Sequence, residues 1–214
     1  MQKTISIILV VLSSVLNAGY FDSNGVTLDG IIEDGEYANN ARVFDSSLLT
    51  MTGGGASIIN VKDNSHLNVI STKTPLSGYY EGGGGIYDID VTQNASLTFS
   101  GGIVESIELF HDATALLNGG EITYLECLQY DEVGKSITID CKDGWQWLYD
   151  SKQKISGIVG EWHNGDSFSI QFIDPTFHPE IFKPTWTHVE VVPEPMSIGL
   201  LALGGLALNL RKRV

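Results

Sequence analysis

The chain has 214 residues, and its 26 Asp and Glu outnumber its 12 Lys and Arg, which gives a formal net charge of −14 at pH 7. A surface this acidic repels nucleic acid and anionic lipid, so we expect no nucleic-acid partner. Gly is abundant at 24 residues and Pro is scarce at 6. Together with frequent Asn, Asp, Ser and Thr, this composition favours many short strands joined by turns, and we expect an all-β fold.

Residues 1–18 show the order of regions found in a secretory signal peptide. Lys3 supplies a positive charge, residues 5–12 form a largely apolar run, and Ala18 ends a smaller and more polar stretch. The apolar run is too short to cross a bilayer as a helix. We therefore expect export across the inner membrane, with a buried N-terminal strand as the alternative.

A repeat of eighteen residues follows. Gly-Gly pairs recur at Gly83-Gly84, Gly101-Gly102 and Gly119-Gly120. The apolar positions between them align as well: Ile86 with Val104 and Ile122, Ile89 with Ile107 and Leu125, and Val91 with Leu109 and Cys127. An earlier copy begins at Gly53, displaced by thirty residues because of a twelve-residue insertion around residues 71–82. A fixed period of this length is typical of stacked repeats.

This repeat predicts a short β-solenoid over residues 19–143, with about five coils of eighteen residues. Alternate residues of each short strand would point inward. Coils stacked roughly 4.8 Å apart would then share one continuous core. A β-sandwich of hairpins is the alternative.

Between residues 144 and 192 the repeat stops, and the sequence predicts a β-rich cap with a hairpin. Residues 155–161 and 167–173 alternate as strands on either side of Asn164-Gly165, which is a strong hairpin signal. Residues 187–192 resemble a final strand. Four aromatic residues would cover the open end of the stack, because a bare terminal coil exposes a sheet edge: Trp145, Trp147, Phe168 and Phe172.

Three carboxylates occupy one repeat position and are the candidate metal ligands. Asp90, Glu108 and Glu126 are flanked by inward residues, so they would form an outward ladder. Carboxylates roughly 4.8 Å apart repel one another, and a cation that prefers oxygen ligands would relieve the repulsion. The ladder is therefore a candidate Ca2+ site, with a solvated acidic face as the alternative.

The case for catalysis is weaker. β-Helical enzymes that cleave polysaccharides need paired carboxylates, or a cation with a basic residue, and the candidates are Asp88, Asp90, Glu105, Glu108 and Lys62. Because no basic cluster accompanies the ladder and the five histidines show no triad spacing, we expect no enzymatic activity. The aromatic candidates for stacking on sugar rings are Tyr79, Tyr80, Trp145 and Trp147.

The two cysteines, Cys127 and Cys141, lie in strand-like segments. Export would permit a disulfide between them. Two small buried apolar side chains are the alternative.

The C-terminal end has three parts in a fixed order. Val192-Pro193-Glu194-Pro195 is followed by residues 196–210, which are mostly apolar or Gly, and then by the cluster Arg211-Lys212-Arg213. At about 1.5 Å per residue, a helix of this length would span roughly 22 Å with the basic cluster on the cytoplasmic side. A tail anchor without sorting is the alternative. The tripartite pattern over residues 193–214 resembles the PEP-CTERM sorting signal.

That resemblance implies processing near the motif by the membrane enzyme exosortase, in a Gram-negative-type bacterium that makes extracellular polysaccharide. The apolar helix would hold the protein in the membrane before processing. We therefore expect a secreted or cell-surface structural protein of the extracellular matrix. A polysaccharide-binding module and a small β-helical polysaccharide lyase or hydrolase are the alternatives.

Overall fold

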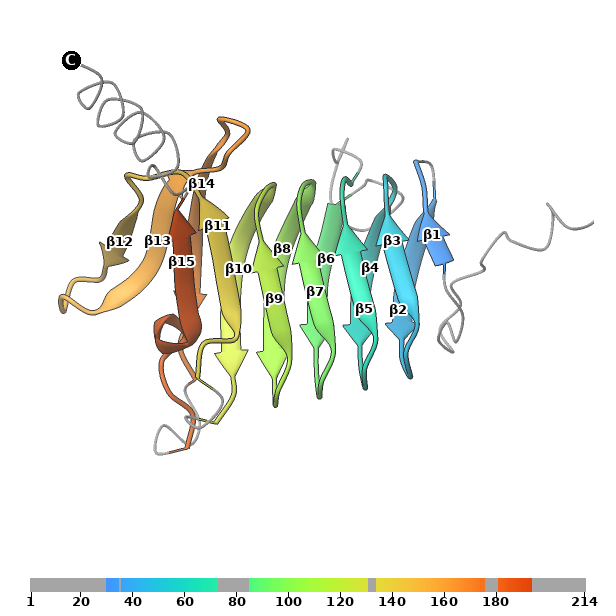
Figure 1. Ribbon diagram of the computed structural model, residues 1–214, viewed down its shortest axis with the longest axis horizontal. Coiled ribbons are helices and arrows are strands. Elements are labelled where there is room, and N and C mark those ends of the chain that lie inside the picture. Colours follow the sequence, from blue (N-terminus) through green and yellow to red (C-terminus); the bar gives the residue numbers. More distant parts are fainter. Residues whose placement is uncertain (1–29, 35, 73–84, 131–133, 176–180, 194–214) are drawn as a thin grey trace, which may run out of the picture.

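The computed structural model describes residues 30–34, 36–72, 85–130, 134–175 and 181–193 (Figure 1). They form two β-sheets and one 3-10 helix, Thr185–His188, which confirms the all-β class. The predicted signal peptide and the apolar segment 196–210 lie outside the described residues. Within the described ranges, no helix has the length and apolar character needed to span a membrane.

The short-strand sheet lies in front in Figure 1. Its strands, in spatial order, are β1 (Gly30–Ile32), β3 (Leu48–Met51), β5 (His66–Val69), β7 (Ser96–Phe99), β9 (Thr114–Leu117), β11 (Ile137–Cys141) and β15 (Val189–Pro193). The long-strand sheet lies behind it. Its order is β12 (Gln146–Tyr149), β13 (Ile155–Glu161), β14 (Ser167–Ile173), β10 (Glu121–Leu128), β8 (Ile103–Phe110), β6 (Gly85–Val91), β4 (Gly55–Val61) and β2 (Tyr37–Val43).

From β1 to β11 the chain alternates between the two sheets, and the pairing follows the repeat. In the long-strand sheet Leu109 pairs in parallel with Val91 and with Cys127, eighteen residues away on either side. Ile89 pairs with Ile59, thirty residues earlier, which is the register that the displaced copy predicted. This parallel pairing confirms the predicted alignment and excludes a body built from antiparallel hairpins.

Aligned apolar residues fill the space between the sheets, as the repeat predicted. Leu109 is fully buried in its column. So are Val61, Ile86, Ile89, Val91, Val104, Ile107 and Leu125 on the long-strand sheet and Leu67, Val69, Phe99, Leu117, Ile137 and Ile139 on the short-strand sheet. One repeat could not bury these side chains alone, so the strands depend on their stacked neighbours for stability.

The long strands contain one break in their inward–outward alternation. In β6, Ile86 and Ile89 are both buried, while Tyr87 and Asp88 between them are half-buried. The ladder to β8 pairs Ile86 and Asp88 but omits Tyr87. The break shifts the phase by one residue, so Asp88 shares the outer face of β6 with Asp90.

At one corner the repeated Gly-Gly pairs are required by close packing. A Cβ atom on Gly102 would lie 2.6 Å from the Thr72 backbone nitrogen, and one on Gly120 would lie 2.7 Å from the Gly102 carbonyl oxygen. Both glycines also have positive φ, at 92° and 79°. The period of the Gly-Gly pairs therefore reflects how tightly consecutive corners nest.

The predicted cap hairpin is confirmed, because β13 and β14 are antiparallel around a turn at Gly165. The cap also continues both sheets of the body, which was not predicted. β14 lies parallel to β10, and β15 lies parallel to β11. The final strand begins at Val189, two residues later than expected, because Thr185–His188 forms the 3-10 helix.

Aromatic residues cover this end of the core as expected. Trp147 packs edge-on against Trp145 and Phe172, with ring centroids 5.0 and 6.1 Å apart. Trp162, which the sequence did not single out, is fully buried and stacks on Phe168 at 4.1 Å.

The predicted disulfide is not formed. Cys127 lies in β10 of the long-strand sheet and Cys141 at the end of β11 in the short-strand sheet, and both thiols are buried and free. They occupy different positions of the repeat, since Cys127 pairs with Leu109 whereas Cys141 pairs with Pro193. Burial raises the pKa of Cys127 to about 12 and that of Cys141 to about 11, so both are small apolar core residues.

Candidate functional site

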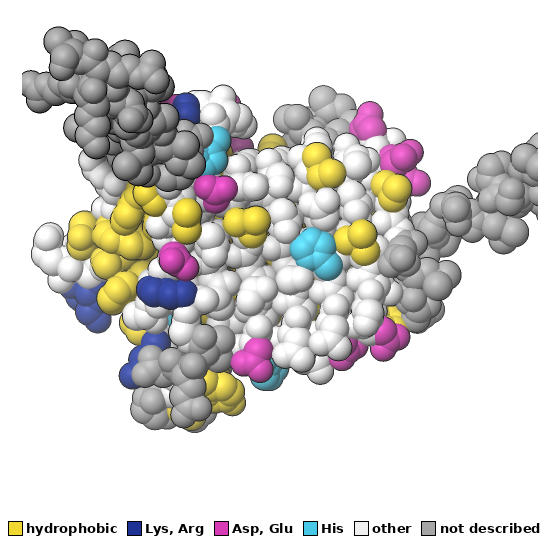
Figure 2. Space-filling view, viewed as in Figure 1, with side chains coloured by type: hydrophobic (Ala, Val, Ile, Leu, Met, Phe, Trp, Pro, Cys, Tyr) yellow, Lys and Arg dark blue, Asp and Glu magenta, His cyan; other side chains and the backbone are white. Residues whose placement is uncertain are grey.

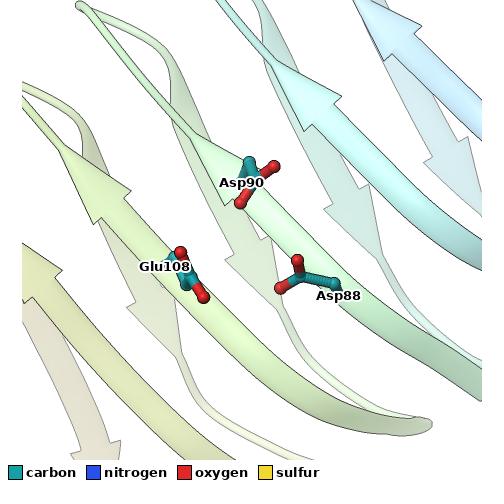
Figure 3. A group of neighbouring side chains, drawn as sticks. All are labelled: Asp88, Asp90 and Glu108. Atoms are coloured by element: carbon teal, nitrogen blue, oxygen red, sulfur yellow. The ribbon is translucent and has the colours of Figure 1, made fainter. Parts of the chain in front are cut away.

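The strongest cluster of chemically active side chains lies on the outer face of the long-strand sheet. Asp88 and Asp90 project from β6, and Glu108 projects from β8 directly opposite Asp90 (Figure 3). One carboxylate oxygen from each lies within 4.8 Å of the others. We call these three residues the acidic triad.

The predicted ladder of Asp90, Glu108 and Glu126 has the expected register, since Glu108 pairs with both of the others. The three oxygens that come together, however, include Asp88 in place of Glu126. The two-residue spacing of Asp88 and Asp90 was the available signal, because residues i and i+2 of a strand share a face. The three-residue spacing of the apolar columns at Ile86 and Ile89 was the corresponding signal for the phase break.

Burial raises the pKa of all three carboxyl groups of the acidic triad, and repulsion from neighbouring carboxylates adds to the effect at Asp88 and Glu108. The pKa of Asp88 is raised to about 7, first by burial and then by the charges of Asp90 and Glu108. Burial also raises the pKa of Asp90, against the opposing effect of Lys62, and that of Glu108, with further contributions from Glu126 and Asp90. The Oδ1 atom of Asp88 is buried without a hydrogen-bond partner. A shared proton or a bound cation would relieve this unfavourable arrangement.

The triad offers the ligand chemistry that Ca2+ prefers, which is hard carboxylate oxygens close together. The lyase candidates also meet here: Glu105 and Glu108 act electrostatically on Asp88, and Lys62 acts on Asp90. Of the predicted sugar-stacking residues, Trp145 and Trp147 instead pack against the core as part of the cap. Tyr79 and Tyr80 lie outside the described residues.

The short-strand sheet presents a different surface. Strands β3, β5, β7 and β9 contain no Asp, Glu, Lys or Arg. His66 shares a 2.8 Å hydrogen bond with Ser96, and burial lowers its pKa, so it is neutral near pH 7. Figure 2 shows this face, where acidic and basic side chains lie toward the rim and the cap rather than over the middle strands. The two sheets of the body therefore differ sharply in charge.

The predicted sorting motif begins inside the folded body. Val192 and Pro193 are the last residues of β15, where they pair with Asp140 and Cys141 of β11. The remaining residues assigned to the signal, Glu194, Pro195, Arg211, Lys212 and Arg213, lie outside the described residues. No linker separates the sheet from the motif.

No protein-family model, curated protein or solved structure matches this chain.

Proposed function

We propose that this chain is a structural protein of the bacterial cell surface or extracellular matrix, and that exosortase sorts it through its C-terminal signal. In this proposal the folded body is a short β-solenoid. The alternation of the chain between two parallel sheets with one shared core supports that assignment. A stack of this kind can serve as a structural unit on the cell surface, and this role requires no catalytic site.

The proposal depends most on the position at which the folded body ends in the sequence. β15 closes the short-strand sheet and ends at Pro193, the first proline of the motif. The folded body therefore reaches the start of the predicted signal, so processing at the motif would release it with β15 intact. Before processing, the body would lie close to the outer side of the membrane.

The acidic surface is compatible with a location in the extracellular matrix, where the protein would meet polysaccharide and cations. Four of the 12 basic residues belong to the predicted end segments, which leaves 8 basic against 26 acidic residues and a net charge of −18 for residues 19–194. Such a charge favours solubility and the uptake of cations. We further propose that the acidic triad binds Ca2+ as a structural ion, with Glu126 next to it in the ladder.

Fractionation of cells tests the sorting proposal. A tagged chain is expressed in a polysaccharide-producing bacterium with its exosortase gene intact or deleted. We expect the protein in the matrix fraction of the first strain and in the membrane fraction of the second. Equal recovery from the matrix of both strains would refute exosortase sorting.

A second candidate function, a polysaccharide lyase or hydrolase, has one observation in its favour. The pKa of Asp88 is about 7, which suits a general acid or base, and Lys62 is close enough to act on Asp90. Release of reducing ends from acidic polysaccharides, abolished in Asp88→Asn, would support this candidate over the structural one. Absence of release from a panel of such polymers would leave the structural proposal in place.

A further inference from the structure

A groove lies where the repeating body meets the cap. It has a volume of about 690 Å3, and it runs between the Gly-Gly corners that precede β8 and β10 and the hairpin of β13 and β14. Pockets of 300–1,000 Å3, roughly, are the usual size for small-molecule sites, and they occur preferentially at boundaries between structural units. The acidic triad is not among the residues that line this groove.

Part of the groove lining is closely packed. Gly102 and Gly120 belong to it, and neither has room for a Cβ atom. The indole nitrogen of the buried Trp162 donates a 2.8 Å hydrogen bond to the Gly120 carbonyl oxygen, which ties the hairpin to the corner. A ligand would therefore meet a preformed surface, which lowers the entropic cost of binding.

The hairpin tip holds its polar groups in place. The Asn164 side-chain amide donates to the Asp166 carboxylate at 2.8 Å, and the Asp166 backbone nitrogen donates to the Asn164 side-chain oxygen at 2.9 Å. The Trp162 backbone nitrogen donates to the Asp166 carbonyl oxygen at 2.8 Å, which closes the turn. The backbone of Asp166 is therefore held in place by hydrogen bonds within the turn. Its carboxylate still has lone pairs that can accept hydrogen bonds from a ligand.

The lining selects for one class of ligand. Glu121 and Asp166 supply carboxylates, several Ser and Thr residues supply hydroxyls, and the lining residues include no Lys or Arg. Two carboxylates without a cation repel uronates and sulfated sugars. The same carboxylates accept hydrogen bonds well from hydroxyl groups. The half-buried Ile103 and Val159 add an apolar part to the lining that suits the CH face of a sugar ring.

We propose that this groove binds an uncharged oligosaccharide segment. The inference rests on the proposed association with extracellular polysaccharide and deepens it, because it identifies the recognised polymer as neutral. Glu121 and Asp166 are the specificity-determining residues, since their charge excludes acidic sugars while their oxygens accept hydrogen bonds from sugar hydroxyls.

Calorimetric titration of the full-length chain, in a detergent without a sugar headgroup, tests the inference. The neutral probes are cellohexaose, maltohexaose and mannohexaose, and the anionic probes are hexasaccharides of alginate and polygalacturonate. We expect binding of at least one neutral hexasaccharide and of neither anionic one. Glu121→Gln and Ser169→Trp, which fills the groove from an exposed strand position, should each weaken binding at least tenfold.

Glu190→Gln is the matched control, since it removes the same charge from an exposed position on the short-strand sheet and should leave the affinity unchanged. A melting temperature within the range of the wild type shows that each variant is folded. The inference is overturned if no neutral probe binds, if an anionic probe binds equally well, or if both groove variants bind like wild type. If the groove variants still reach the matrix fraction, sorting stands whatever the titrations show.

Discussion

Glu108 on β8 lies directly opposite Asp90 on β6, and both carboxylates project from the outer face of the long-strand sheet beside Asp88. Like charges opposite one another in a ladder destabilise it. A bound cation would offset the repulsion between these facing carboxylates. Substitutions in the acidic triad therefore test most directly whether this surface binds a cation.

Calcium should stabilise the folded chain through the acidic triad. A ligand that binds only the folded state adds about 2.7 kcal/mol at a hundredfold excess over its dissociation constant. We expect millimolar Ca2+ to raise the melting temperature more than NaCl of matched ionic strength, and Glu108→Gln to lose this difference. Glu190→Gln on the other sheet should keep it. Equal shifts from both salts in the wild type would mean that the triad is a solvated acidic face.

Without calcium, Asp88 should make stability depend on pH. Its ordinary pKa is near 3.8 and its pKa in the fold is about 7, so between these values the folded state keeps a proton that the unfolded state has lost. The contribution of Asp88 to the free energy of unfolding therefore falls as pH rises through this window and then levels off. In EDTA, Asp88→Asn should be more stable than wild type at pH 8 and should approach it near pH 4. Parallel pH profiles for the two proteins would contradict the raised pKa.

The register of the stack predicts opposite effects for two adjacent residues. Leu109 is fully buried between Val91 and Cys127, so Leu109→Asp would bury an unpaired charge at a cost of about 3–5 kcal/mol, comparable with the whole stability of a small domain. Glu108→Ala should be neutral or stabilising, because it removes repulsion from the outer face. Thermal melts followed by circular dichroism compare them. Similar destabilisation by both changes would show that the inward and outward assignment is wrong.

The Gly-Gly corners should tolerate no side chain. A Cβ atom on Gly119 would overlap the Ser100 carbonyl oxygen, so Gly119→Ala should cost about 2–3 kcal/mol through overpacking. Gly134→Ala is the control, because its φ of 75° is unfavourable for Ala but no atom lies within 4 Å, and it should cost about 1 kcal/mol. Denaturant unfolding measures both. A smaller loss for Gly119→Ala than for Gly134→Ala would refute the packing explanation of the repeat.

The sequence alone was enough to predict the features that repeat. Val91, Leu109 and Cys127 share a column because each copy places an apolar residue at the same offset, and the hairpin strands were predicted to the residue because Asn164-Gly165 fixes the turn. What joins the cap to the body could not be predicted in this way. The pairing of β14 with β10, and of β15 with β11, links segments that share no repeat signal. Which strand completes which sheet depends on long-range packing around residues such as Trp162.

The acidic triad was predicted only in part for a similar physical reason. Strict alternation places Asp90 and Glu108 correctly, because both follow the phase break by the same number of residues. Asp88 lies at the break itself, where Ile86 and Ile89 both turn inward. Its two-residue spacing from Asp90 places it on the same face, but the predicted ladder followed a single position of each repeat, and that position does not include Asp88.

The intact mass of the protein recovered from the extracellular matrix tests the central claim most directly. The account predicts a mature chain that lacks residues 1–18 and ends within or beside Pro193-Glu194-Pro195, so that β15 is retained and residues 196–214 are absent. Changing these three residues to Ala should leave the chain unprocessed in the membrane fraction. A matrix-derived protein that still extends to Val214, or one that is cut upstream of β15, would contradict the account.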